Sequence, residues 1–546
     1  MSRDQRLVLI ASILGSFVAF LDIAVVNVAL PAIRAELGGG LAAQQWIVDA
    51  YLLALGSLIL TAGALSDRFG RKRVFAGGLV GFALTSLLCA AAPNVQILIL
   101  ARGLQGVAGA LLVPSSMAMI ISNFHGPSQG KAIGTWTAWT GISFVLGPMA
   151  GGALVDAGSW RWVFAINVVP IAATLAVLSR VQPESRPAHR TPVDLVGAAL
   201  CVVGLGGIIY GLIEAPTRGW GVPSIYLPLA GGLMAFAAFL LFERTTAHPM
   251  LTFELFTNRN FTAGNLATVA IYAGLTVATF LLTVFVQQVA GYAAIAAGLA
   301  LVPVTLIMFV LSPVFGRLSA RQGPRLFMTV GPITAACGFA LLLRVDASAS
   351  YVSQILPGVL VFGLGLSATV APLTAAVLGG INERQAGIGS AINNAIARVA
   401  GLLAVAAVGA IVDARFAASI DRETSTTHTF DAPALAFLRE ARRQPLDTTV
   451  PPHLPSGSRA ALQPLLANAS VEALHAGLWS MAALMALGGV ISAVGLKNPP
   501  AVGAFHGPGR IGTARGKPTR RWRRNRSAAP TGAPRPSSRY PRSSGS

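Results

Sequence analysis

The stretch GALSDRFGRKRV, Gly63 to Val74, places four cations and one acid within twelve residues. The chain around it is poor in charge, since 11% of its 546 residues are charged and 54% are hydrophobic. A soluble domain averages about 25% charged residues. This charged stretch therefore needs its own explanation, which depends on the apolar blocks on either side of it.

Long apolar blocks flank this stretch and fill most of the chain. A block of about 18 or more apolar residues predicts a membrane-spanning helix, because about 20 residues cross the hydrocarbon core. The segment must be helical, since lipid offers no hydrogen-bond partner to its backbone. We count fourteen such blocks, roughly at residues 7–30, 44–66, 74–93, 95–121, 131–154, 161–180, 193–214, 224–243, 261–288, 294–318, 326–343, 351–379, 387–412 and 472–494. The predicted fold class is an all-α polytopic membrane protein.

Basic residues are distributed unequally between the segments that join these blocks. With the N-terminus inside, the inner segments hold sixteen Lys and Arg, and the short outer loops hold four. Because cytoplasmic loops carry the excess of Lys and Arg, both termini are predicted to be cytoplasmic. Residues 497–546 add twelve Lys and Arg and no acid, in a sequence rich in Pro, Gly and Ser. This composition predicts a disordered tail attracted to anionic lipid, and we expect no nucleic-acid partner.

The charged stretch has a second copy at an offset of 253 residues. GALSDRFGRKRVFAGG at 63–78 matches GRLSARQGPRLFMTVG at 316–331, and Asp67 becomes Ala320 in the second copy. The positions with identical partners are Gly63, Leu65, Ser66, Arg68, Gly70 and Gly78. A duplicated bundle of this kind predicts two halves with a substrate site between them.

The repeat sets the expected domain boundaries. We expect a six-helix bundle at 1–190, two extra helices at 191–248, a second six-helix bundle at 249–496 and the basic tail at 497–546. Residues 413–471 are polar and are expected to form a long outer loop, with a short amphipathic helix near 433–442.

Ionisable residues within the apolar blocks give the clearest functional signal, because they are costly in lipid and usually functional. The clear cases are Asp22, Asp49, Arg102 and Arg398. By residue count the first three lie about 7–12 Å below the outer surface, so mutual pairing is feasible. Low dielectric disfavours a charged carboxyl group and a nearby Arg favours it, so such an acid can bind and release a proton. The alternative is a buried Asp–Arg pair that only fixes helix packing.

Six motifs resemble those of the major facilitator superfamily, and most closely its fourteen-helix drug:proton antiporters of the EmrB/QacA type. The stretch at 63–74 resembles the superfamily signature between helices 2 and 3. The others are LDIAVVNVALP (21–31), ARGLQGVAGA (101–110), GISFVLGPMAGG (141–152), SWRWVFAINVVP (159–170) and FVQQVAGYAAIAAGLALVP (285–303). The resemblance covers about residues 7–494, and it implies the major facilitator fold, with two extra central helices between the two bundles.

The resemblance implies a proton-coupled antiporter that exports small amphipathic or cationic compounds across the plasma membrane. It assigns proton coupling to Asp22, Asp49 and Arg102. It also implies a cytoplasmic gate that latches the two halves when the cavity faces outward, formed by Gly63, Asp67, Arg68, Gly70, Arg71, Lys72 and Arg73. We expect Gly63 and Gly70 to allow close packing and a tight turn.

A fifth-helix antiporter motif is also implied. Its small residues permit close helix contact, and its proline bends the helix. The motif consists of Gly141, Gly147, Pro148, Gly151 and Gly152.

Uncharged polar residues in or near the blocks are candidates for substrate binding, because unsatisfied polarity in lipid is costly. An aromatic ring such as that of Trp136 can also stack on a flat or cationic ligand. The candidates are Asn27, Tyr51, Gln105, Trp136, Gln287, Gln288, Asn393 and Asn394. Each could instead be an interhelical hydrogen bonder or an interfacial anchor.

A proton symporter that imports a small metabolite stays open as the alternative function, and we do not expect an enzyme. The seven histidines fall in loops, at block ends or in the tail, so no convergent catalytic set is indicated. No GxxxxGK[ST] loop for ATP is present. The three separated cysteines predict neither a metal site nor a disulfide. We expect a monomer without a cofactor, whose partners are membrane lipid, protons and a small-molecule substrate.

Overall fold

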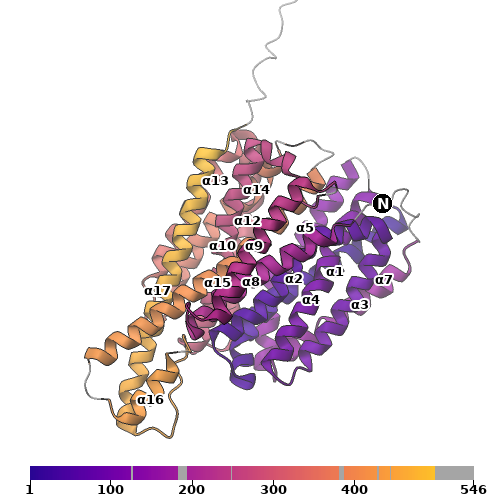
Figure 1. Ribbon diagram of the computed structural model, residues 1–546. Coiled ribbons are helices and arrows are strands. Elements are labelled where there is room, and N and C mark those ends of the chain that lie inside the picture. Colours follow the sequence, from indigo (N-terminus) through magenta and orange to yellow (C-terminus); the bar gives the residue numbers. More distant parts are fainter. Residues whose placement is uncertain are drawn as a thin grey trace, which may run out of the picture. The chain divides into compact units, whose positions relative to one another are not determined.

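The computed structural model describes residues 1–498 except 125–126, 183–192, 248, 348, 380, 382–385, 427–429 and 443. Within these residues every regular element is a helix (Figure 1). The α-helices are α1 Arg3–Leu37, α2 Leu41–Phe69, α3 Arg71–Ala90, α4 Val95–Asn123, α5 Pro127–Asp156, α6 Trp162–Ala165, α7 Val168–Ser179, α8 Leu195–Arg218, α9 Pro223–Thr245, α10 Arg259–Gln288, α11 Ala294–Ala300, α12 Val302–Gln322, α13 Pro324–Leu342, α14 Leu356–Leu378, α15 Ala386–Thr426, α16 Ala432–Ala441 and α17 Ser456–Gly495. A 3₁₀-helix, η1 Phe253–Thr257, precedes α10, and a short π-helix, η2 Tyr351–Ile355, precedes α14. The prediction of an all-helical protein is confirmed.

Thirteen helical segments among the described residues are long and apolar enough to cross a membrane. Helix α5, which occupies the fifth predicted block, is not among those thirteen. The total of fourteen spans therefore stays a prediction. Two predicted blocks are broken within their length, one between α6 and α7 and one between α11 and α12.

The helices of each sequence half pack mainly on one another. In the first half α1 packs against α4, α5 and α7, and α2 and α3 pack against α4. In the second half α10 packs against α15 and α17, and α13 packs against α14 and α17. Helices α8 and α9 pack together, and α8 also contacts α2 of the first half and α15 of the second (Figure 1). The domain boundaries proposed from the repeat stay a prediction.

The two copies of the repeat form matching turns. Gly70 joins α2 to α3 at φ 96°, and Gly323 joins α12 to α13 at φ 87°. The Gly70 amide donates to the Ser66 carbonyl at 3.1 Å, and the Gly323 amide donates to the Ser319 carbonyl at 2.8 Å. Only glycine adopts this left-handed conformation without a steric penalty. The tight turn expected at Gly70 is thus present, together with its counterpart 253 residues later.

The segment at 413–471 is mostly helical, so its prediction as a long loop is wrong. Helix α15 continues to Thr426 and α17 begins at Ser456, beside α16 (Figure 1). The short helix expected near 433–442 is present as α16, where the Asp431 carboxylate accepts a hydrogen bond from the Ala434 amide. Charged residues such as Arg415 lower the hydropathy of this region, but a helix that extends into water does not need an apolar sequence.

Polar contacts between the two halves gather near one end of the helices. Arg34 on α1 pairs with Asp447 at 2.5 Å and donates to Gln288 Oε1 at 2.7 Å. Nearby, the Ile295 amide donates to the Asp156 carboxylate at 2.9 Å. This is the end where α1 and α5 finish and α11 begins, opposite the Gly70 turn. The two halves are therefore closed against each other at the end that holds Arg34.

Candidate functional site

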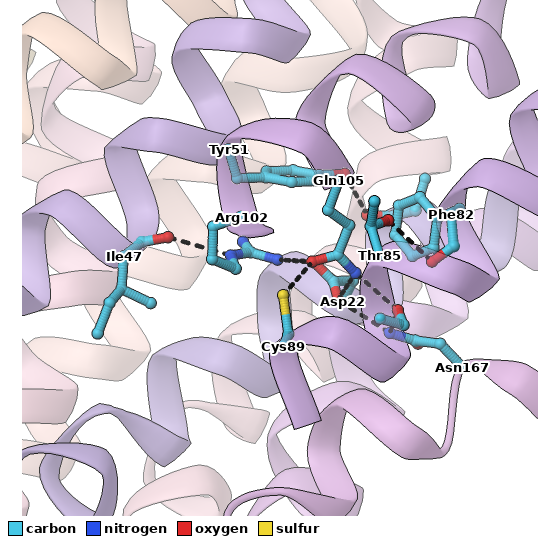
Figure 2. Close-up of polar contacts among 11 residues, drawn as sticks. Asp22, Ile47, Tyr51, Phe82, Thr85, Cys89, Arg102, Gln105 and Asn167 are labelled. Carbon is cyan, nitrogen blue, oxygen red and sulfur yellow. Dashed lines mark hydrogen bonds and ion pairs between the residues drawn. The ribbon is translucent and has the colours of Figure 1, made fainter. Parts of the chain in front are cut away.

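The carboxylate of Asp22 lies at the centre of a buried polar network (Figure 2). Asp22 is on α1 and is 0% exposed. Its Oδ2 accepts a hydrogen bond from Arg102 Nη1 at 2.6 Å. Its Oδ1 accepts from Gln105 Nε2 at 3.0 Å and from Asn167 Nδ2 at 2.9 Å. Three donors therefore converge on one acid in the membrane-spanning part of the chain.

Arg102 on α4 makes further contacts besides its ion pair with Asp22. Its Nε donates to the Ile47 carbonyl at 3.1 Å, and its Nη1 also donates to Gln105 Oε1 at 2.7 Å. Its guanidinium carbon lies 4.3 Å from the centroid of the Tyr51 ring, which is a cation–π distance. A buried ion pair is tolerated when further hydrogen bonds satisfy its remaining atoms, and this pair has them.

Asn167 and Ser86 complete the network, although neither was among the residues predicted from the sequence. The side-chain amides of Gln105 and Asn167 donate to Ser86 Oγ at 2.8 and 3.2 Å. Asn167 lies between α6 and α7, where the sixth apolar block is broken. An amide in the middle of that block was the available signal, because buried polar groups in lipid need partners.

Asp49 lies apart from this network, so the expectation that Asp22, Asp49 and Arg102 pair together fails for Asp49. Its side chain is 0% exposed, and neither carboxyl oxygen has a hydrogen-bond partner among the described residues. It lies on α2 between two positions that contact α15. Gln45 Nε2 donates to the Val405 carbonyl at 2.7 Å, and a Cβ added at Gly56 would lie 3.4 Å from Arg398 Cβ. Because residues 45, 49 and 56 share one helical face, Asp49 faces the second half.

The charged stretch at 63–74 makes its described contacts within the first half. Arg71 pairs with Asp67 at 3.2 Å, one turn away across the Gly70 bend. Arg71 Nη1 donates to the Ala118 carbonyl at 3.2 Å, and Lys72 Nζ donates to the Val181 carbonyl at 2.5 Å. The expected latch between the halves is not formed by these described contacts.

The other members of the stretch lie near the surface. The Arg68 guanidinium carbon is 5.4 Å from the centroid of its neighbour Phe69, and Arg73 is exposed. A Cβ added at Gly63 would meet no atom within 4 Å. The close packing expected at Gly63 is therefore absent from this structure.

The glycines of the antiporter motif bring α5 against both halves. A Cβ at Gly147 would overlap Ala24 of α1, and one at Gly151 would lie 3.0 Å from the Val25 carbonyl oxygen. A Cβ at Gly152 would lie 2.6 Å from the backbone nitrogen of Ile295, in the second half. Such approaches are open only to glycine. Pro148 lies inside α5, and the structure does not describe the surroundings of Gly141.

The predicted substrate-binding residues do not form one group. Tyr51 and Gln105 belong to the Asp22 network, as described above. Trp136 is buried and its Nε1 donates to Ser16 Oγ at 3.1 Å. Asn27 on α1 has a buried Oδ1 without a partner among the described residues.

The candidates in the second half are engaged with neighbouring backbone or side chains. Gln287 Nε2 donates to the Val28 carbonyl at 3.0 Å, and Gln288 accepts the bond from Arg34. Asn393 Nδ2 donates to Asn265 Oδ1 and Thr268 Oγ1, both on α10. Asn394 is exposed.

Comparison with known proteins identifies the relatives of this chain. It is 34% identical over 414 residues to the methylenomycin A resistance protein of Bacillus subtilis (strain 168), covering 74% of this chain and 87% of the relative. It is also 34% identical to the puromycin resistance protein pur8 of Streptomyces alboniger, over 78% of this chain and 85% of the relative.

A similar fold has been seen in a solved structure. A bacterial homologue of the human lysosomal transporter Spinster, in an inward-facing and unoccupied conformation, aligns with a TM-score of 0.59 and 14% identity, covering 91% of this chain and all of the other. The family model described as Major Facilitator Superfamily matches residues 12–405. The chain therefore belongs to the major facilitator superfamily.

Proposed function

We propose that this protein is a proton-coupled antiporter that exports small amphipathic or cationic antibiotic-like compounds from the cell. The observation that carries the proposal is the buried Asp22–Arg102 pair with its converging amides. Relatives named for resistance to methylenomycin A and puromycin support an export role. The excess of Lys and Arg in the inner segments supports a plasma-membrane protein with cytoplasmic termini.

The Asp22 network is suited to proton coupling because three hydrogen-bond donors converge on its carboxyl group. All three donors point at the carboxylate, so protonation of Asp22 would oppose one of these hydrogen bonds and weaken the ion pair with Arg102. Arg102 also holds the Ile47 carbonyl on α2. A proton that arrives at Asp22 therefore loosens the contacts that join α1, α2 and α4.

Asp49 is suited to a different part of the cycle. An ionised carboxyl group that is buried without a donor is costly, so we propose that Asp49 carries a proton in this conformation. Because Asp49 faces α15, a change in the contact between the halves alters its surroundings directly. In this scheme cargo and proton compete at the interface between the halves.

The closed contacts at Arg34 fit a cycle of alternating access. With the proposed orientation this closed end is the outer one, so the structure corresponds to the state that takes up cargo from the cytoplasm. The charged stretch at 63–74 lies at the opposite end, where we propose that it latches the halves only in the outward-facing state. This accounts for the pairing of Asp67 with Arg71 of its own half in the present conformation.

Inverted membrane vesicles provide the test. Cargo added to energised vesicles should release protons from the lumen of wild-type vesicles, as expected of an antiporter. The Asp22→Asn and Asp49→Asn variants should each lose this release. A symporter would move protons in the same direction as cargo, and equal coupling in wild type and both variants would overturn the assignment.

The control is Glu472→Gln, which also removes one carboxylate. Glu472 pairs with Arg422, and both side chains are about half exposed. Exposed pairs contribute about 0–1 kcal/mol, so coupling in this variant should equal that of wild type.

A further inference from the structure

A polar cavity lies outside the Asp22 network. It has a volume of about 990 Å³ and lies between the α8–α9 connection, α15 and α16. Small-molecule sites commonly enclose about 300–1,000 Å³. The cavity is at the end of α8 that contacts Trp46 at the start of α2, so it shares the closed end of the helices. None of the residues that bind Asp22 lines it.

A buried carboxylate without a partner faces this cavity. Asp413 on α15 lines the cavity and is only 7% exposed. Its Oδ1 has no hydrogen-bond partner among the described residues. Like Asp49, a buried acid in this condition carries a proton unless a cation satisfies its ionised form. The cavity therefore contains an acceptor that the protein leaves unused.

The arginines around the cavity do not compete strongly for anionic ligands. Arg218 pairs with Glu214 at 2.9 Å, and Arg442 pairs with Asp421 at 2.9 Å. Arg439 is exposed, where water screens its charge. Of the two acids that line the cavity, Asp421 is thus paired with Arg442, whereas Asp413 has no arginine partner among the described residues.

The remaining walls supply apolar surface. Leu435 and Leu438 of α16 line one side, and Trp220 lines the cavity with 54% of its side chain exposed. An indole ring favours flat apolar groups and cations at its face. A cavity lined by a buried acid, an indole and two leucines suits a cation with a large apolar body.

We propose that this cavity is a binding site for amphipathic organic cations, with the Asp413 carboxylate as the counter-ion. The site is separate from the proposed proton-coupling acids and does not depend on their role. Under the proposed orientation it faces the outside, where exported cations leave the protein.

Equilibrium dialysis of the full chain in lipid nanodiscs tests the site with tetraphenylphosphonium as the probe. The measurements use an Asp22→Asn/Asp49→Asn background, in which the candidate acids of the interior are neutral. Adding Asp413→Asn should weaken binding roughly 30-fold or more, the usual effect of removing one partner of a buried charge pair. Adding Glu472→Gln should leave the affinity unchanged, and neutral triphenylphosphine oxide should bind equally weakly to both forms. Equal probe affinity with and without Asp413→Asn would overturn the proposal.

A labelling experiment tests the same site with Asp413 intact. Ala418 lines the cavity and is exposed, and the native Cys337 is the exposed cysteine among three. In an Ala418→Cys/Cys337→Ser protein, tetraphenylphosphonium should slow modification by a membrane-impermeant maleimide several-fold, while triphenylphosphine oxide should not. Labelling at the same rate with and without the cation would contradict a site at this position.

Discussion

Arg102 illustrates what one side chain can organise inside a membrane. Its planar guanidinium contacts a backbone carbonyl on α2, the acid on α1 and an amide on its own helix at the same time. A lysine has a single ammonium group and cannot reproduce this fork. The identity of this cation is therefore as important as its charge.

Replacing Arg102 with lysine tests this statement. Arg102→Lys keeps the charge but loses at least one of the hydrogen bonds to the Ile47 carbonyl and the Gln105 amide oxygen, and a hydrogen bond to a charged group contributes about 1.5–3 kcal/mol. We expect a lower thermal-unfolding midpoint in detergent and strongly reduced proton-coupled export in proteoliposomes. Unchanged export and an unchanged midpoint would show that positive charge alone is sufficient.

The sequence identified the charged members of the network but not all of its polar members. Asp22 and Arg102 were predictable because an ion in an apolar block is rare. Asn167 and Ser86 were missed because small polar residues are common in membrane helices and mostly bond to their own backbone. The isolation of Asp49 was also not predictable, since residue counting gives depth along a helix but not the direction in which a side chain points.

Helix α5 depends on the absence of side chains at the two places where it packs against a neighbouring helix. Its glycines allow it to approach α1 on one side and α11 on the other. The motif was visible in the sequence, but the partner in the second half was not, because the packing of one half on the other depends on conformation. The hydropathy pattern predicted the positions of most helices. It did not predict that α15 and α17 extend beyond the apolar blocks.

Two substitutions of the same kind on α5 separate packing from helix propensity. Gly152→Ala would place a methyl group against the backbone of Ile295, and overpacking of this type costs about 1–3 kcal/mol. We expect a lower unfolding midpoint and slower export. Gly134→Ala meets no atom within 4 Å, and alanine favours a helix by about 1 kcal/mol. The control should therefore be unchanged or slightly more stable, and equal effects at both positions would exclude an interface at Gly152.

At the scale of the whole molecule, the two ends of the bundle behave differently. One end is held shut by Arg34 and its partners, and at the other end the charged stretch contacts its own half. This asymmetry is the structural basis for treating the two ends as alternate gates. It leads to one prediction for each end.

Weakening the closed end should raise the population that is open there. Arg34→Gln removes the ion pair with Asp447, and conformational coupling of this kind typically changes an equilibrium about 5–150-fold. We expect faster labelling of an Asn27→Cys reporter by an impermeant maleimide added on the outer side, in a Cys337→Ser background. The matched control is Arg422→Gln, which removes the exposed ion pair between Arg422 on α15 and Glu472 on α17. A labelling rate equal to that of the control would show that Arg34 does not hold this end.

Asp67→Asn should separate stability from function. The Asp67–Arg71 pair is partly exposed, so its loss should change the stability of this conformation by only about 0–1 kcal/mol. If the acid is needed for the latch in the other conformation, export should still fall markedly. The unfolding midpoint and the rate of export in proteoliposomes provide the two measurements, and normal export with a normal midpoint would remove Asp67 from the gate.

The length of α17 has a consequence for anything that leaves the cavity beside α16. Forty residues of helix span about 60 Å, whereas a bilayer with its headgroups is about 40–45 Å thick. With the proposed membrane orientation, the lobe formed by α16 and the ends of α15 and α17 would therefore rise above the lipid surface into the surrounding water. In the proposed cycle, a hydrophobic cation released there would begin its diffusion in bulk solvent, so it would be less prone to dissolve back into the leaflet from which it was removed.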